Sequence, residues 1–186
     1  PLAVTQSGTH TVRVQTHTVA AGNNRLLLVS VAIYDKVAVS VSSVTFGGVS
    51  LTRVGRSLNE SSVELWRLNA PAVSTASVTV TLSGSASVAA SATTFYGVNL
   101  TSPLGGFQSA TGSGSSKSFT VSSNAGEYPV GVVASRAVST STAASGQAQL
   151  WTGKTRTSGS DVWGANAGAP GAASVAMGWT TSGSGT

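Results

Sequence analysis

Side chains that could do acid–base chemistry are few in this chain and widely spaced. The five acids are Asp35, Glu60, Glu64, Glu127 and Asp161. A glycosidase needs two carboxylates that face each other across the scissile bond. Glu60 and Glu64 are four residues apart, a spacing that makes no such pair on a strand or in a turn. Either is therefore expected to be a solvated surface group.

Other catalytic arrangements are equally hard to build. His10 and His17 lie seven residues apart on the predicted opening strand, so they fall on opposite faces and are poor ligands for one metal. No Gly-x-Ser-x-Gly elbow occurs, and Lys117-Ser118 lacks the preceding glycine and spacing of a phosphate-binding loop. The chain has no cysteine, which excludes disulfides and thiolate ligands. We predict a protein that is not an enzyme and uses no metal or cofactor.

Binding through aromatic rings is the other chemistry that the side chains suggest. Trp66 and Trp179 are expected in strands, where packing in the core or at its rim is their ordinary role. Trp163 lies in a predicted long surface loop, residues 152–171, and Trp151 ends a strand. These two are the candidate residues for stacking on sugar rings.

Two Asn-x-Ser/Thr sequences, at Asn59 and Asn99, are candidate glycosylation sites. If the source cell glycosylates its secreted proteins, both asparagines are expected in surface loops. A glycan there would shield a surface that carries little charge.

Composition narrows the class of protein and its partners. Of 186 residues, 40% are hydrophobic and only 8% are charged, against about a quarter charged in typical domains. The net charge is +5, but the basic residues are scattered singly, unlike a nucleic-acid-binding face. No apolar run is long enough for a transmembrane helix. The wealth of Ser and Thr, and a start at Pro1 instead of Met, suggest a secreted protein whose leader was removed.

The elements that must position these residues are strands. Val78, Val80 and Leu82 alternate with polar residues, as in a half-buried strand. Residues 25–33 form a denser apolar run, typical of a strand covered on both faces. Gly47-Gly48 predicts a tight hairpin. We predict an all-β fold: a jelly-roll-like antiparallel β-sandwich of about nine or ten strands, with little or no helix.

Several segments follow one another in a recognisable order. They are residues 24–29, 41–48, 51–54, 63–66, 77–84, 96–98, 103–105, 149–151 and 177–179. Together they resemble a β-sandwich module that recurs in secreted bacterial and archaeal proteins, often beside adhesive or surface-display modules. The resemblance runs from about Asn23 to Ser184 and implies the fold and an extracellular setting. It carries over no catalytic residue.

The chain departs from that module at both ends. The module closes with one more apolar strand, whereas small polar residues follow Trp179. Conversely, an apolar segment precedes the ordinary first strand, residues 11–19. We divide the chain into an N-terminal arm, residues 1–10, and a single domain, residues 11–186. Either the closing strand is missing from this chain, or the arm of one subunit fills the vacant place in the next.

In the second case Leu2, Val4 and Thr5 form the donor strand, and Val175, Met177 and Trp179 border the acceptor groove. The expected function is an extracellular, cell-surface structural subunit that self-assembles into a pilus-like filament or a surface layer. A carbohydrate-binding or adhesive module of a larger secreted protein, in contact with polysaccharide or a cell surface, is the main alternative. A viral capsid or decoration protein is a further one.

Overall fold

The prediction of an all-β fold is confirmed. The computed structural model describes residues 2–34, 39–58, 61–136, 140–154 and 162–182, with the backbone alone for residues 2–15 and 162–167. Within those ranges it contains antiparallel strands and no helix, so none of the described segments is a long apolar helix of the kind that crosses a membrane. The strands are β1 (Leu2–Val19), β2 (Leu26–Tyr34), β3 (Val41–Phe46), β4 (Val49–Ser50), β5 (Thr52–Ser57), β6 (Ser61–Asn69), β7 (Ser74–Phe95), β8 (Ser116–Val121), β9 (Val130–Arg136), β10 (Ser141–Ala143), β11 (Ala148–Lys154), β12 (Val162–Gly168) and β13 (Val175–Thr181).

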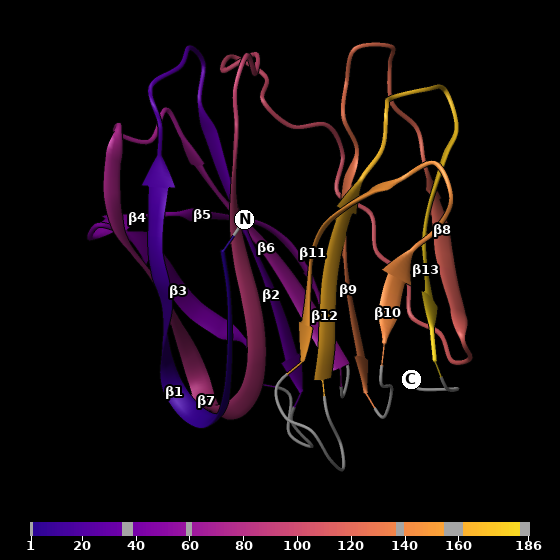
Figure 1. The fold of residues 1–186 in the computed structure, drawn as a ribbon, viewed down its shortest axis with the longest axis horizontal. Coiled ribbons are helices and arrows are strands. Elements are labelled where there is room, and N and C mark those ends of the chain that lie inside the picture. Colours follow the sequence, from indigo (N-terminus) through magenta and orange to yellow (C-terminus); the bar gives the residue numbers. More distant parts are fainter. Residues whose placement is uncertain (1, 35–38, 59–60, 137–139, 155–161, 183–186) are drawn as a thin grey trace.

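The described strands form three sheets (Figure 1). The large sheet has the order β4-β3-β7-β2-β6-β5, with β1 also paired to β7. The middle sheet has the order β11-β12-β9, and the end sheet has the order β10-β13-β8. The structure describes 13 strands, more than the predicted nine or ten. The count includes the short strands β4 and β10 and the unexpected strand β12.

The 22-residue strand β7 organises the large sheet because it bends. Its residues 78–82 pair with β3, whereas residues 87–95 pair with β2. β1 follows the same bend, and its register with β7 breaks between Gln6 and Thr11. Figure 1 shows β1 and β7 turning together at the lower left. The bend folds the large sheet over on itself, and the main hydrophobic core lies inside it.

β2 is buried along its whole length, as its dense apolar run predicts. Alternate residues, such as Leu27 and Val29, enter the main core inside the large sheet. The other face carries Ala32 and Tyr34, which pack beneath Trp151 of the middle sheet. Burial of each large apolar side chain stabilises the fold by about 1.5–3 kcal/mol. β2 therefore joins the large and middle sheets into one packed structure.

The turn prediction at Gly47-Gly48 is confirmed, and the loop prediction for residues 152–171 is wrong. Both glycines have positive φ, 55° and 85°, and β3 and β4 pair directly across them. Within residues 152–171, however, β12 lies between β11 and β9 and pairs with both. Hydrogen bonds to two neighbours hold this glycine- and alanine-rich segment extended, although its intrinsic strand propensity is low.

Three half-exposed aromatic rings lie against glycines of other segments. Tyr96 covers Gly22, Phe107 covers Gly55 of β5, and Tyr128 covers Gly168 of β12. A Cβ atom at any of these glycines would collide with the ring.

The Phe107 contact anchors a long connection. Residues 96–115 link the large sheet to the end sheet without forming a strand. This connection crosses β5, and the ring on Gly55 holds it there.

Gly55→Ala should therefore displace Phe107 and reduce the free energy of unfolding by about 1–3 kcal/mol. Urea unfolding followed by tryptophan fluorescence measures this loss. Gly105→Ala, at a glycine with open space around it, is the matched control and should change stability by less than about 0.5 kcal/mol. The effect of Gly55→Ala should shrink in a Phe107→Ala background; an unchanged effect would disprove the contact.

Candidate functional site

One acid of the chain is buried in the core of the large sheet. The Glu64 side chain on β6 is fully buried. Its Oε1 accepts a hydrogen bond from the Val41 backbone N–H at 2.7 Å, and its Oε2 accepts one from Trp66 Nε1–H at 3.2 Å. The expectation that Glu64 is solvated is wrong. The sequence pattern that could have predicted this burial is the alternation of side chains along β6, which places Glu64 on the same face as Trp66 and Leu68.

Burial raises the pKa of the Glu64 carboxyl, and the two hydrogen bonds and the nearby charges of Arg53 and Arg56 oppose that rise. Arg53 places a guanidinium nitrogen 4.0 Å from Oε2 and lies 5.8 Å above the Trp66 ring. Among the residues that the structure describes, no group of three acids or histidines is arranged to hold a metal ion. Glu64 therefore acts as an acceptor that fixes the start of β3, next to the register shift between Val41 and Ser43.

Of the other acids and histidines, only Glu127 and His17 have described side chains, and neither has a hydrogen bond to another acid or histidine among the described residues. Asp35, Glu60 and Asp161 lie outside the described residues. Glu127 is exposed, and hydrogen bonds from Asn124 lower the pKa of its carboxyl. His17 is buried, its Nε2 is 2.8 Å from Thr94 Oγ1, and burial lowers the pKa of the ring.

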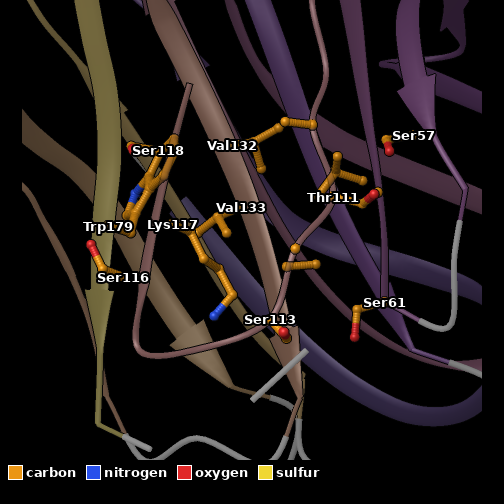
Figure 2. A pocket seen from close by; sticks show the side chains of 14 residues that line it. Ser57, Ser61, Thr111, Ser113, Ser116, Lys117, Ser118, Val132, Val133 and Trp179 are labelled. Carbon is orange, nitrogen blue, oxygen red and sulfur yellow. The ribbon is translucent and has the colours of Figure 1, made fainter. Parts of the chain in front are cut away.

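A cavity of about 390 Å³ lies where the three sheets meet. Figure 2 shows its lining side chains. They come from the ends of β5 and β6, from the connection before β8, and from β8, β9 and β13: Ser57, Ser61, Val63, Ala110, Thr111, Gly112, Ser113, Ser116, Lys117, Ser118, Val132, Val133, Ala134 and Trp179. The cavity thus combines an apolar floor on β6 and β9 with a rim of hydroxyl groups.

Two side chains give this cavity its polarity. Lys117 and Trp179 are direct cross-strand neighbours on β8 and β13, so their side chains lie side by side on one face. Lys117 Nζ donates a hydrogen bond to the Gly114 carbonyl at 2.7 Å, and burial lowers the pKa of its ammonium. Trp179 is 2% exposed, and its Nε1–H has no hydrogen-bond partner in the described structure.

Of the two candidate sugar-stacking residues, only Trp151 has a described side chain, and that side chain is not on the surface. Trp151 is buried between the large and middle sheets, against Tyr34 and Ala89. Trp163 lies in strand β12, and its side chain is outside the described structure. The burial of Trp151 was not predicted from the sequence, because it depends on the stacking of the sheets and on strand β12, and neither was predicted.

Asn59 lies outside the described residues, whereas Asn99 is exposed in a turn. Asn99 Oδ1 accepts a hydrogen bond from the Thr101 backbone N–H at 3.1 Å. Asn99 therefore lies at the surface, as expected of a glycosylated asparagine. Its occupancy stays a prediction.

The predicted donor segment is paired within its own chain. Leu2, Val4 and Thr5 lie opposite Ala92, Ala90 and Ala89 of β7. The edge that this segment occupies is therefore the edge of β7, in the large sheet. Exchange of the segment between subunits stays a prediction, and any acceptor site for it has to be sought at β7.

The acceptor groove was predicted on β13, a strand that has described neighbours on both sides over part of its length. Val175, Met177 and Trp179 are buried, and β8 pairs with β13 from residue 175 to residue 180. On the opposite edge, β10 pairs with residues 179–181. The Gln147 side-chain amide bonds both the N–H and the carbonyl of Gly178, at 3.2 Å and 3.0 Å, as a neighbouring strand would. The three side chains therefore pack in a core. Residues 175–177 have a described partner strand on the β8 side, and the acceptor role of this strand stays a prediction.

Comparison of the chain with protein-family models, with curated proteins and with solved structures finds no match. Function is therefore inferred from the geometry of the molecule itself. Its two distinctive features are the N-terminal strand on the edge of β7 and the polar cavity between the sheets.

The buried carboxylate predicts a measurable pH dependence. A raised pKa means that the stabilisation from protonated Glu64 is complete below the ordinary carboxyl pKa of about 4.3. It is lost as the pH rises through the raised value. Glu64→Gln removes this dependence but leaves one donor, Val41 N–H or Trp66 Nε1–H, without an acceptor, which costs about 1–3 kcal/mol.

The difference in unfolding free energy between wild type and Glu64→Gln should therefore be largest at acid pH and narrow towards neutral pH. Urea unfolding across that range measures it. Glu127→Gln, at an exposed carboxyl, is the control and should not reproduce the narrowing. A difference that widened with rising pH would contradict the raised pKa.

Proposed function

We propose that this protein is an extracellular structural subunit without enzymatic activity, and that its copies join by exchanging the first part of β1. The observation that carries the proposal is the position of residues 2–6 on the edge of β7, opposite residues 88–92. A strand that pairs along one side only can leave a sheet with the loss of a single backbone ladder. The same edge can then receive the equivalent strand of another copy.

The register of β1 supports a hinge at this point. Residues 2–6 and residues 11–19 pair with different parts of β7, and the register shifts between Gln6 and Thr9 and again between Thr9 and Thr11. The first part can therefore detach while the second part stays paired. The proposal therefore takes residues 1–10 as the arm and residues 11–186 as the domain.

The free energies of the exchanged and unexchanged arrangements should differ little. An arm bound to its own β7 and an arm bound to a neighbour's β7 make the same backbone ladder, so the exchange itself changes the free energy little. Association of subunits costs about 4–15 kcal/mol in lost freedom of motion. Further contact between subunits, or a high local concentration, must offset that cost. The charge-poor faces of the sheets provide surfaces that repel one another weakly.

Head-to-tail exchange gives a closed ring only if the rotation between successive subunits brings the last one back to the first; otherwise it gives an open assembly. An open chain of subunits, as in a pilus-like filament or a surface layer, follows from that geometry. The Ser- and Thr-rich, charge-poor composition supports an extracellular setting.

Paired cysteines can report where the arm binds. Because the chain has no cysteine of its own, Val4→Cys with Ala90→Cys introduces one defined disulfide across the β1–β7 register. Under oxidising conditions at high protein concentration, exchange predicts a ladder of covalent oligomers on a non-reducing gel. Ala3→Cys with Ser91→Cys tests the adjacent pair, since neighbouring pairs alternate in hydrogen bonding and spacing.

Thr45→Cys with Thr79→Cys, between β3 and β7, is the matched control and should give a cross-linked monomer in every condition. If the β1–β7 pairs also gave only cross-linked monomer at all concentrations, exchange of the arm would be excluded.

Deletion of residues 1–9 tests the same role without cysteines. Since residues 11–19 keep their pairing with β7, the shortened chain should remain folded by circular dichroism. It should also fail to form the filaments or sheets that the full chain forms in negative-stain images. Normal assembly of the deleted chain would show that the arm is not the donor.

A further inference from the structure

The end of β1 contacts both ends of the long strand β7. Val19, the last residue of β1, lies opposite Ser74 at the start of β7. The next strand, β2, pairs instead with the last part of β7. The chain between β1 and β2, residues 20–25, therefore crosses from one layer of the folded-over large sheet to the other. It makes this crossing after the last register shift between β1 and β7, which falls between Val14 and Thr16.

Two side-chain hydrogen bonds tie neighbouring residues of β1 to different ends of β7. The exposed Thr18 Oγ1 lies 2.9 Å from Oγ1 of Thr75, the residue directly opposite it. The buried His17 reaches further: its Nε2 lies 2.8 Å from Thr94 Oγ1, although its backbone partner is Ala76. β1 is thus bound to one layer through its backbone and to the other through His17.

Tyr96, the residue after β7, binds the residue after β1. Tyr96 Oη accepts a hydrogen bond from the Ala20 N–H at 3.1 Å and donates one to the Ala20 carbonyl at 3.5 Å. The phenol therefore pairs with both backbone groups of Ala20, in place of a further residue of β7. The Tyr96 ring covers Gly22, where a Cβ atom would collide with it.

Backbone hydrogen bonds extend this attachment along the crossing. The Gly97 N–H donates to the Asn23 carbonyl and the Val98 N–H donates to the Asn24 carbonyl, each at 3.0 Å. All of these bonds must break if the end of β1 leaves its own subunit. We call this set of residues the clasp: residues 16–24, Thr75, Thr94 and residues 96–98.

We propose that the clasp sets the length of the strand that copies exchange. Residues before Thr16 can pass to a neighbouring copy, whereas residues 16–24 stay with their own β7. The inference rests on the arm exchange of the proposed function and names what limits it. Exchange of the whole of β1 would break the clasp and withdraw the buried His17 and Val19 from the fold. Exchange of residues 2–6 leaves every contact of the clasp in place.

Hydrogen exchange followed by nuclear magnetic resonance tests the clasp within one subunit, at low protein concentration. In the wild type, the slowest amides of residues 16–19 should exchange more slowly than those of residues 2–6. Tyr96→Phe removes the phenol oxygen and keeps the ring on Gly22. It should speed exchange at residues 16–19 by about fivefold, the effect of one lost hydrogen bond on a local opening equilibrium, and leave residues 2–6 unchanged.

Tyr128→Phe is the matched control, because Tyr128 is also half-exposed and covers a glycine, Gly168, in the middle sheet. It should change exchange in neither part of β1. Unchanged exchange at residues 16–19 in Tyr96→Phe would overturn the clasp. Equal acceleration of the whole large sheet would also overturn it, because Tyr96 would then act on overall stability.

Paired cysteines test the limit on exchange between copies. Thr16→Cys with Ser77→Cys joins opposite residues where the clasp begins. This pair should give only cross-linked monomer under the conditions in which Val4→Cys with Ala90→Cys gives a ladder of oligomers. Addition of Tyr96→Phe and Thr94→Val, which removes the hydroxyl bound by His17, should allow the Thr16 and Ser77 pair to give a ladder as well.

The outcomes separate the clasp from the proposed function. A ladder from the Thr16 and Ser77 pair without the loosening substitutions would overturn the clasp as the limit on exchange. Cross-linked monomer alone after loosening would also overturn it. Absence of a ladder from both pairs would overturn arm exchange itself, whereas slow hydrogen exchange at residues 16–19 that depends on Tyr96 would still establish the clasp within the subunit.

Discussion

The backbone pairing along β7 is the constraint on which the rest of the structure depends. One edge of this strand carries β1 along most of its length, and the other edge carries β3 and then β2. Because β7 bends between these two partners, it belongs to two layers of the large sheet and encloses the main core between them. β2 gains its second covered face from the same arrangement, and this face holds the middle sheet in place. The cavity, in turn, exists because the middle and end sheets are held against the ends of β5 and β6.

Because the chain has few charged residues, its buried polar groups are paired mainly through hydrogen bonds to uncharged groups. Ser30 and Ser91 pair across β2 and β7 at 2.8 Å. Glu64 receives a backbone and an indole N–H instead of a close ion pair, and the Gln147 amide stands in for a strand beside Gly178. These polar contacts fix registers and strand ends, where hydrophobic burial alone is not directional. Among the described residues, the indole N–H groups of Trp151 and Trp179 are buried without such a partner.

The parts of the fold that could be predicted are those that depend on local pattern. The alternation around Val80, the dense apolar run of β2 and the hairpin at Gly47-Gly48 all specify strands directly. Strand β12 could not be predicted, because its Gly, Ala and Asn residues are extended by pairing with two neighbours and not by their own preference. The burial of Trp151 and of Glu64 depends on which sheet covers which face, and that is a property of the tertiary stacking. The cavity could not be predicted for the same reason: its lining residues come from five separate segments of the chain. In the sequence, Lys117-Ser118 fails to match a phosphate-binding loop, and Trp179 is predicted only as a strand residue.

The pairing of β1 with β7 also has a consequence for how the molecule is made. Leu2 and its partner Ala92 are 90 positions apart, so a ribosome working at about 5–20 residues per second needs roughly 5–20 s to make the second after the first. During that interval the first part of β1 lacks its partner on β7. Contacts so distant along the chain also form slowly once synthesis is complete. Nascent copies held close together on one messenger would have time to capture each other's leading strands, so the route of synthesis can influence which partner each strand finds.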